Sequence, residues 1–95
     1  MTPSQRKMAR HALGLDGERR RSYRNRYFTA VDTPGEDEWN DLCRRGLAER
    51  EKGSGKLVHF FLTDEGARLA LDEGEILDPE DFPPLASEMR ATQGE

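Results

Sequence analysis

The sequence predicts a small α+β domain with three helices and a three-stranded antiparallel sheet, in the order helix, strand, helix, strand, strand, helix. Three observations support this fold class. Helix-start motifs lie at three places, two strand-like segments flank a glycine-rich tip, and the 95 residues, 34% of them hydrophobic, suffice for one compact core. We therefore expect a single domain over residues 1–74 and an acidic, proline-containing tail over residues 75–95.

Each helix is predicted from its first residues and from the spacing of its apolar side chains. In the first helix, expected over residues 3–13, Thr2 is the N-cap and Gln5 completes a capping box. The second helix follows Thr33 and the third follows Thr63, again with a threonine as the N-cap. All three segments carry apolar residues three or four positions apart, which gives each helix one face to bury.

The strands are expected near residues 24–31, 47–51 and 57–62. Aromatic and β-branched residues, which favour strands, are frequent in the first and third of these segments. The last two strands flank the tip at residues 52–56 and form a hairpin. We expect the core to draw on every element, and its predicted members are Met8, Ala12, Leu15, Phe28, Trp39, Leu42, Leu47, Phe60 and Leu71.

Charge is distributed unevenly along the chain. The net charge is −4, yet residues 1–30 carry +6, residues 31–95 carry −10, and the expected tail alone carries −5. Such an asymmetry is typical of a basic arm or an acidic tail. The negative net charge of the whole chain therefore does not exclude an anionic partner such as nucleic acid, which would bind to the basic arm.

The densest basic cluster is a candidate nucleic-acid-binding site. It comprises Arg19, Arg20, Arg21, Arg24 and Arg26, and Tyr23 and Tyr27 lie among these arginines. Arginines bind phosphates and aromatic rings stack on bases, so the mixture suits nucleic acid. Lys52 and Lys56 flank the hairpin tip and provide a second phosphate contact. The alternative for the arginines is a solvated loop in which they pair with acids of the same chain. The alternative for the two lysines is that they keep the hairpin tip soluble.

A different set of residues would serve a protein partner. Phe60 and Phe61 are adjacent in a strand, so they point to opposite faces of the sheet and one of them is expected at the surface. We take Phe61 as that residue. Glu36, Asp37 and Asp41 make the second helix acidic, and acids so placed can substitute for the phosphates of nucleic acid at a basic protein surface.

The sequence offers little that supports enzymatic chemistry. Cys43, His11 and His59 lie in separate elements, and each is better interpreted as a packed residue than as a nucleophile or a metal ligand. We find no phosphate-binding loop and no dinucleotide fingerprint, so we expect no catalytic residues, no metal and no cofactor. One cysteine, no apolar run long enough to span a membrane and no secretory leader favour a cytoplasmic protein without a membrane partner.

The segment from Trp39 to Leu71 resembles the second half of a winged-helix domain. The resemblance is carried by WNDLCRRGLAER, by the KGSGK tip and by HFFLTDEGARLAL. MarR- and PadR-type regulators have a similar helix ending in "GL", a wing hairpin, and an "LT" that is separated from a following glycine by two residues. The resemblance implies a winged-helix-like fold and a regulator that contacts nucleic acid. The chain departs from the pattern in offering one helix before the wing, where a helix-turn-helix has two.

The whole chain also resembles small proteins that phages and prophages encode. The shared features are RHALGL at residues 10–15, YRNRYF at residues 23–28, and the segments around GLAER and LTDEG. This resemblance implies a phage-borne accessory protein and assigns no role to any residue.

Two functions therefore remain open at this point. In the first, the protein is a non-enzymatic, winged-helix-like regulator that contacts nucleic acid through its basic arm and wing. In the second, it is an interaction module or inhibitor that binds a host or phage protein, for instance by acidic mimicry of nucleic acid. The sequence defines neither the partner nor the oligomeric state.

Overall fold

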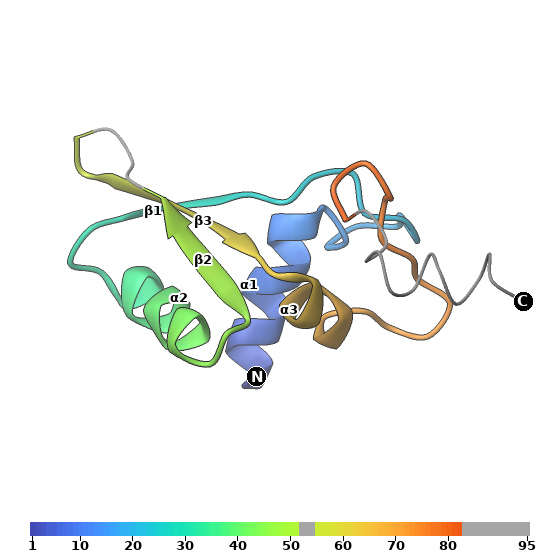
Figure 1. Ribbon diagram of the computed structural model, residues 1–95, viewed down its shortest axis with the longest axis horizontal. Helices are drawn as coiled ribbons and strands as arrows, with labels where there is room; N and C mark the ends of the chain where they lie inside the picture. The colour runs from blue at the N-terminus through green and yellow to red at the C-terminus, as the bar shows by residue number, and fades with distance from the viewer. Residues whose placement is uncertain (52–54, 83–95) are drawn as a thin grey trace, which may run out of the picture.

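The computed structural model describes residues 1–51 and 55–82 (Figure 1). The elements follow one another as α1 (Pro3–Leu13), β1 (Tyr27–Ala30), α2 (Pro34–Arg44), β2 (Ala48–Glu51), β3 (Leu57–Leu62) and α3 (Asp64–Leu69). The order of elements and the α+β fold class agree with the prediction from the sequence. Between β1 and β2 the chain forms the one helix α2, so the topology is winged-helix-like without a paired helix-turn-helix.

Threonine caps define where the helices begin. Thr2 accepts a hydrogen bond from the backbone N–H of Gln5, and the Gln5 side chain accepts one in return from the Thr2 backbone. Thr33 and Thr63 cap α2 and α3 by accepting from the backbone N–H three residues later. Each cap satisfies a backbone donor that the helix itself leaves unpaired, which fixes the first turn.

The sheet has the spatial order β1-β3-β2, with both neighbours antiparallel to the central strand β3. Burial alternates along β3, so that Val58, Phe60 and Leu62 face the helices and the intervening residues face outward. All three helices lie on one side of the sheet (Figure 1). The sheet therefore has an inner face that is covered by helices and an outer face that is not.

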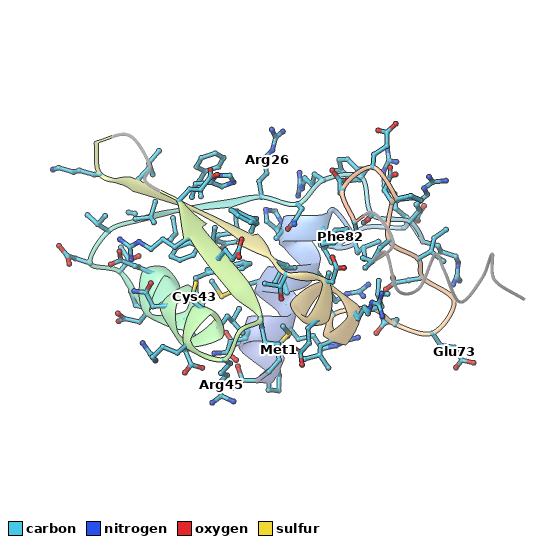
Figure 2. All side chains as sticks on the ribbon, viewed as in Figure 1. Met1, Arg26, Cys43, Arg45, Glu73 and Phe82 are labelled. Carbon is cyan, nitrogen blue, oxygen red and sulfur yellow. The ribbon has the colours of Figure 1, made fainter. Side chains whose placement is uncertain are left out.

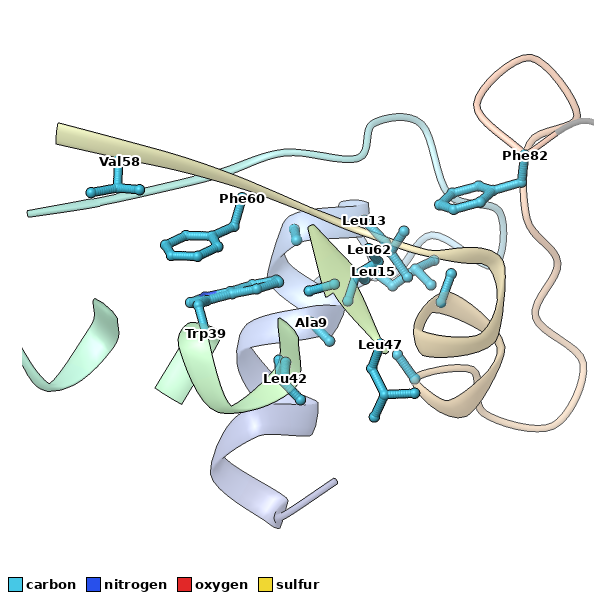
Figure 3. Packing of buried hydrophobic residues seen from close by; sticks show 14 residues of the cluster. Ala9, Leu13, Leu15, Trp39, Leu42, Leu47, Val58, Phe60, Leu62 and Phe82 are labelled. Carbon is cyan, nitrogen blue, oxygen red and sulfur yellow. The ribbon is translucent and has the colours of Figure 1, made fainter. Parts of the chain in front are cut away.

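The core forms between the inner face and the helices (Figure 3). Trp39 from α2 is fully buried, and its ring lies 5.5 Å from the ring of Phe60 with a tilt of only 20°. The predicted core members Ala12, Leu15, Leu42 and Leu47 are also buried, whereas Met8 and Leu71 are half-buried at its margin.

The prediction that Phe28 belongs to the core is wrong, because its side chain is 56% exposed. The register of the sheet explains the error. Phe28 lies opposite His59, an outward-facing residue of β3, whereas its neighbour Tyr27 lies opposite the inward-facing Phe60. Adjacent residues of a strand point to opposite faces, so only one of the two aromatic side chains reaches the core.

The first strand is also shorter than the predicted segment 24–31. Asn25 replaces strand pairing with side-chain hydrogen bonds, since its amide accepts from the Leu62 N–H at 2.8 Å and donates to the Leu62 carbonyl at 3.0 Å. The backbone N–H groups of Tyr23 and Arg26 donate to carbonyls at the end of α1 rather than to β3. Residues 22–26 are consequently held in an irregular conformation between α1 and the sheet.

A close contact between α3 and the start of β2 explains the glycine of the LTDEG segment. Gly66 lies so close to the Leu47 carbonyl that a Cβ atom there would collide with it. The same carbonyl accepts a hydrogen bond from the Thr63 N–H at 3.1 Å. Glycine at position 66 therefore lets the short helix α3 pack directly against the backbone at the beginning of the hairpin.

The chain after α3 returns to the end of α1. Arg10 forms a two-pronged ion pair with Glu75, at 2.5 and 2.8 Å, and Ile76 forms a parallel bridge with Arg21. Phe82 is buried against the body. The first eight residues of the expected tail, 75–82, thus pack onto the domain, and the remainder of that segment, residues 83–95, lies outside the described residues.

Candidate nucleic-acid interface

The loop between α1 and β1 carries the arginine cluster that the sequence singles out. Its central feature is Tyr23, whose ring rests against the backbone of Gly14 and remains 47% exposed. The guanidinium of Arg19 lies 4.4 Å from the centre of this ring, and that of Arg24 lies 5.2 Å from it. The two cations and the ring form a stacked group on the surface.

The two tyrosines and the arginines among them lie largely outside the regular strand that the sequence predicts near residues 24–31. Because residues 22–26 are irregular, Arg24 folds back over Tyr23 and donates two hydrogen bonds to the His11 carbonyl, at 3.1 and 2.7 Å. Tyr27 instead turns toward the core, where its ring lies 5.0 Å from that of Trp39. Of the two tyrosines, only Tyr23 is well exposed to a ligand.

A shallow hollow opens beside this group. It is lined by two arginines, one histidine and two aromatic residues, namely Arg24, Arg26, His11, Tyr27 and Phe28. Figure 2 shows the Arg26 side chain extending away from the helices. Within residues 1–51 and 55–82, Arg26 has no carboxylate partner. Arg24 donates its hydrogen bonds to a neutral carbonyl, but an acid lies near it. The pKa of the Asp16 carboxyl is lowered, chiefly by its hydrogen bond with His11 and in part by Arg24. The hollow thus combines aromatic surface with the unpaired charge of Arg26 and with Arg24, whose charge Asp16 offsets in part.

The other two arginines of the cluster have a more acidic environment. Arg21 forms a 3.4 Å ion pair with Asp78. Arg20 lines a hollow that also contains Asp72, Glu73 and Glu75, and Arg19 lies at the same hollow. The pKa of the Asp78 carboxyl is lowered, chiefly because it accepts a hydrogen bond from the Glu80 backbone and also because Arg21 lies nearby. The structure therefore divides the predicted basic site into a free part near Phe28 and a partly neutralised part near residues 72–78.

The hairpin contributes less than the loop. Lys56 is exposed at the start of β3, and Lys52, its predicted companion at the tip, lies outside the described residues. The neighbouring strand β2 presents Glu49 and Glu51 on the outer face of the sheet. Anions approaching the hairpin from that side would meet like charge, so the β1 side is the more favourable approach.

The three acidic residues of α2 that were predicted to contact a protein partner are not equally exposed. Glu36 is buried, forms a 3.0 Å ion pair with Arg50, and accepts a hydrogen bond from the Asp32 N–H. Asp41 accepts from the Gln5 amide at 2.8 Å, and this bond, with help from Arg45 and Arg44, lowers the pKa of its carboxyl. Asp37 alone of the three is well exposed and without such a partner in the described part of the chain.

The outer face of the sheet carries a group of aromatic side chains, of which only Phe61 was predicted from the sequence. Phe61 lies on this face, opposite to Phe60, but it is half-buried rather than exposed. Phe28 and His59 share the face, with their rings stacked at 4.7 Å and a tilt of 17°, and Phe61 lies 5.9 Å from His59. Because side chains alternate along a strand, the buried position of Phe60 predicts that His59 faces outward. The outward position of Phe28 could not be predicted in this way, because it depends on which residue of β3 lies opposite it.

The described residues show no constellation suited to a metal ion. No group of three or more His, Cys, Asp or Glu side chains converges within them. Cys43 is half-buried on α2, and burial raises the pKa of its thiol. In the same part of the chain, no helix has the length and apolar character needed to cross a membrane.

Comparisons with known proteins do not extend these observations. No protein-family model, no curated protein and no solved structure matches the chain.

Proposed function

We propose that this protein is a non-enzymatic nucleic-acid-binding protein, a winged-helix-like regulator of the kind that phages encode. The hollow beside β1 carries the proposal, because Arg24 and Arg26 line it together with exposed aromatic surface. Two guanidinium groups that form no ion pair with a carboxylate can bind successive phosphates, and the adjacent rings can stack on bases. Tyr23 with Arg19 extends this surface along the loop, and Lys56 extends it toward the hairpin.

The alternative, a protein-interaction module acting by acidic mimicry, has weaker support. Of its four proposed contact residues, Glu36 and Asp41 already hold α2 to the rest of the domain. A mimic of nucleic acid needs its carboxylates free for the basic partner. Asp37 and Phe61 remain available for such a contact, which is a smaller surface than the arginine loop offers.

Salt dependence of binding tests the proposed function. Each phosphate that the protein neutralises contributes about −0.9 to the slope of log affinity against log salt on duplex DNA, and about −0.7 on single strands. The double variant Arg24→Ala/Arg26→Ala should therefore flatten the slope by about 1.4–1.8. Fluorescence anisotropy with labelled oligonucleotides between 50 and roughly 200 mM salt gives this slope.

The matched control is Arg44→Ala/Arg45→Ala, which removes the same charge from α2, where both arginines pair with Asp41. We expect this control to change the slope by less than about 0.5. Equal flattening by both variants would show that net charge, rather than the hollow, governs binding. Absence of wild-type binding to single-stranded and duplex DNA at low salt would overturn the proposed function and favour a protein partner, for which Asp37→Lys should slow association.

A further inference from the structure

The outer face of the sheet has a polarity that runs from one edge to the other. On the β1 side it is bordered by Arg24 and Arg26, and on the β2 side by Glu49 and Glu51. A polyanion approaching this face is attracted to the first edge and repelled by the second. The backbone of a bound nucleic acid would therefore follow β1.

The rings of this face lie next to that path. Phe28, on β1, has one side stacked on His59 and is still 56% exposed. His59 is held in place from the opposite direction by a 3.0 Å contact between its Nδ1 and Glu51. An aromatic ring that is supported on one side and open on the other is a platform on which a base can stack.

Duplex DNA fits this surface poorly. Bases in a duplex are stacked on one another and cannot lie on a protein ring without being displaced from the helix. Groove reading would require a recognition helix, and the first turn of α2, the helix that precedes the hairpin, exposes Asp37. A carboxylate at that position would face phosphates, which disfavours docking of α2 in a groove.

We infer that the ligand of this surface is single-stranded nucleic acid, with its phosphates along Arg24 and Arg26 and a base stacked on Phe28. The inference rests on the proposed function and specifies the form of nucleic acid that the site takes. His59 and Phe61 provide the adjoining surface for a neighbouring base.

The test compares a labelled 15-nucleotide oligo-dT with a 15-base-pair duplex in anisotropy titrations at one salt concentration. Wild-type protein should bind the single strand more tightly than the duplex. Phe28→Ala should weaken single-strand binding by roughly 5- to 150-fold, which corresponds to the loss of one base–ring stack. Its effect on the duplex should be small, and Phe28→Trp should restore single-strand affinity because tryptophan keeps a stacking surface.

Controls separate stacking from other effects. Leu69→Ala removes a side chain that is also half exposed, but on α3, and should leave both affinities unchanged. Thermal unfolding by circular dichroism should show that the Phe28 variants fold like the wild type, since the ring lies outside the core.

Three results would overturn the inference. Duplex binding that equals or exceeds single-strand binding would overturn it while leaving the proposed function intact. An unchanged single-strand affinity of Phe28→Ala would do the same. Self-association of the wild type that Phe28→Ala abolishes, with no binding to either oligonucleotide, would assign the face to a protein contact and overturn both proposals.

Discussion

Arg10 and Arg26 illustrate two uses of the same side chain within the first 30 residues. Arg10, on α1, is 16% exposed, pairs with Glu75 through both of its terminal nitrogens, and donates further hydrogen bonds to the carbonyls of Ala70 and Leu15. Arg26 extends into solvent and has no acidic partner in the described residues. One arginine joins distant parts of the chain, and the other is free to bind a ligand.

This difference shows that the net charge of a segment overestimates the positive charge that is available to a ligand. Residues 1–30 carry +6, but Arg6, Arg10 and Arg21 pair with acids from residues 72–78. The acids after α3 therefore act locally, by holding the returning chain against α1. The cations that remain for a partner are concentrated beside Tyr23 and Phe28, which is why the proposed site is smaller than the sequence suggests.

The largest expected effect is on stability, from removing Arg10. Arg10→Ala leaves the Glu75 carboxylate, which is only 8% exposed, without its partner, and removes two bonds to backbone carbonyls. Breaking such a pair costs about 3–5 kcal/mol, whereas Arg26→Ala should change the free energy of unfolding by less than about 0.5 kcal/mol. Urea denaturation measures both values. Similar losses in the two variants would contradict the distinction between paired and free arginines.

A second prediction concerns acid. The hydrogen bonds from Arg10 lower the pKa of Glu75 from 4.5 to about 2, so the folded state binds this proton more weakly than the unfolded state does. The resulting stabilisation is complete above about pH 4.5 and is lost as the pH falls toward 2, by up to about 3 kcal/mol. Denaturation series at several pH values should show this loss.

The control for the acid prediction is Glu75→Gln. Asp16, Asp41 and Asp78 also have lowered pKa values, so the wild-type curve contains their contributions. The difference between wild type and Glu75→Gln isolates the Glu75 contribution. A difference that does not change between pH 5 and pH 2 would show that Glu75 is not held by a charge-dependent contact.

Local patterns were sufficient to predict most of the fold. Threonine caps, apolar spacing and the alternation in β3 depend on neighbours in the sequence, and the structure places α1 and β3 at the predicted bounds. The shortened β1 was not predictable in this way. Its start depends on hydrogen bonds between Asn25 and Leu62, which are 37 positions apart. The outward position of Phe28 depends likewise on its register with His59.

The sequence predicted which arginines make up the candidate site, but not which of them pair with acids and which remain available to a ligand. The sequence identified all five arginines and left open whether they pair with acids of the same chain. Which arginine meets which acid depends on how residues 72–78 return to α1, a tertiary contact that no local pattern encodes. The hollow beside Phe28 combines residues from α1, the following loop and β1, so it arises only when the chain is folded.

The smallest expected effect comes from releasing one paired arginine. Asp78→Asn removes the charge that faces Arg21 and keeps an oxygen to accept from the Glu80 N–H. Arg21, which is 58% exposed, then becomes available to a phosphate. If it reaches the bound nucleic acid, the slope of log affinity against log salt should steepen by about 0.7–0.9, the value of one added contact.

The control for this release is Asp81→Asn, which removes the same charge three residues away, from an exposed side chain. We expect Asp81→Asn to shift affinity slightly at low salt without steepening the slope, because it adds no contact. Equal changes in both variants would indicate a general charge effect of the C-terminal acids. An unchanged slope in Asp78→Asn would instead show that Arg21 lies beyond the reach of the ligand, and would confine the phosphate contacts to the hollow formed by Arg24 and Arg26.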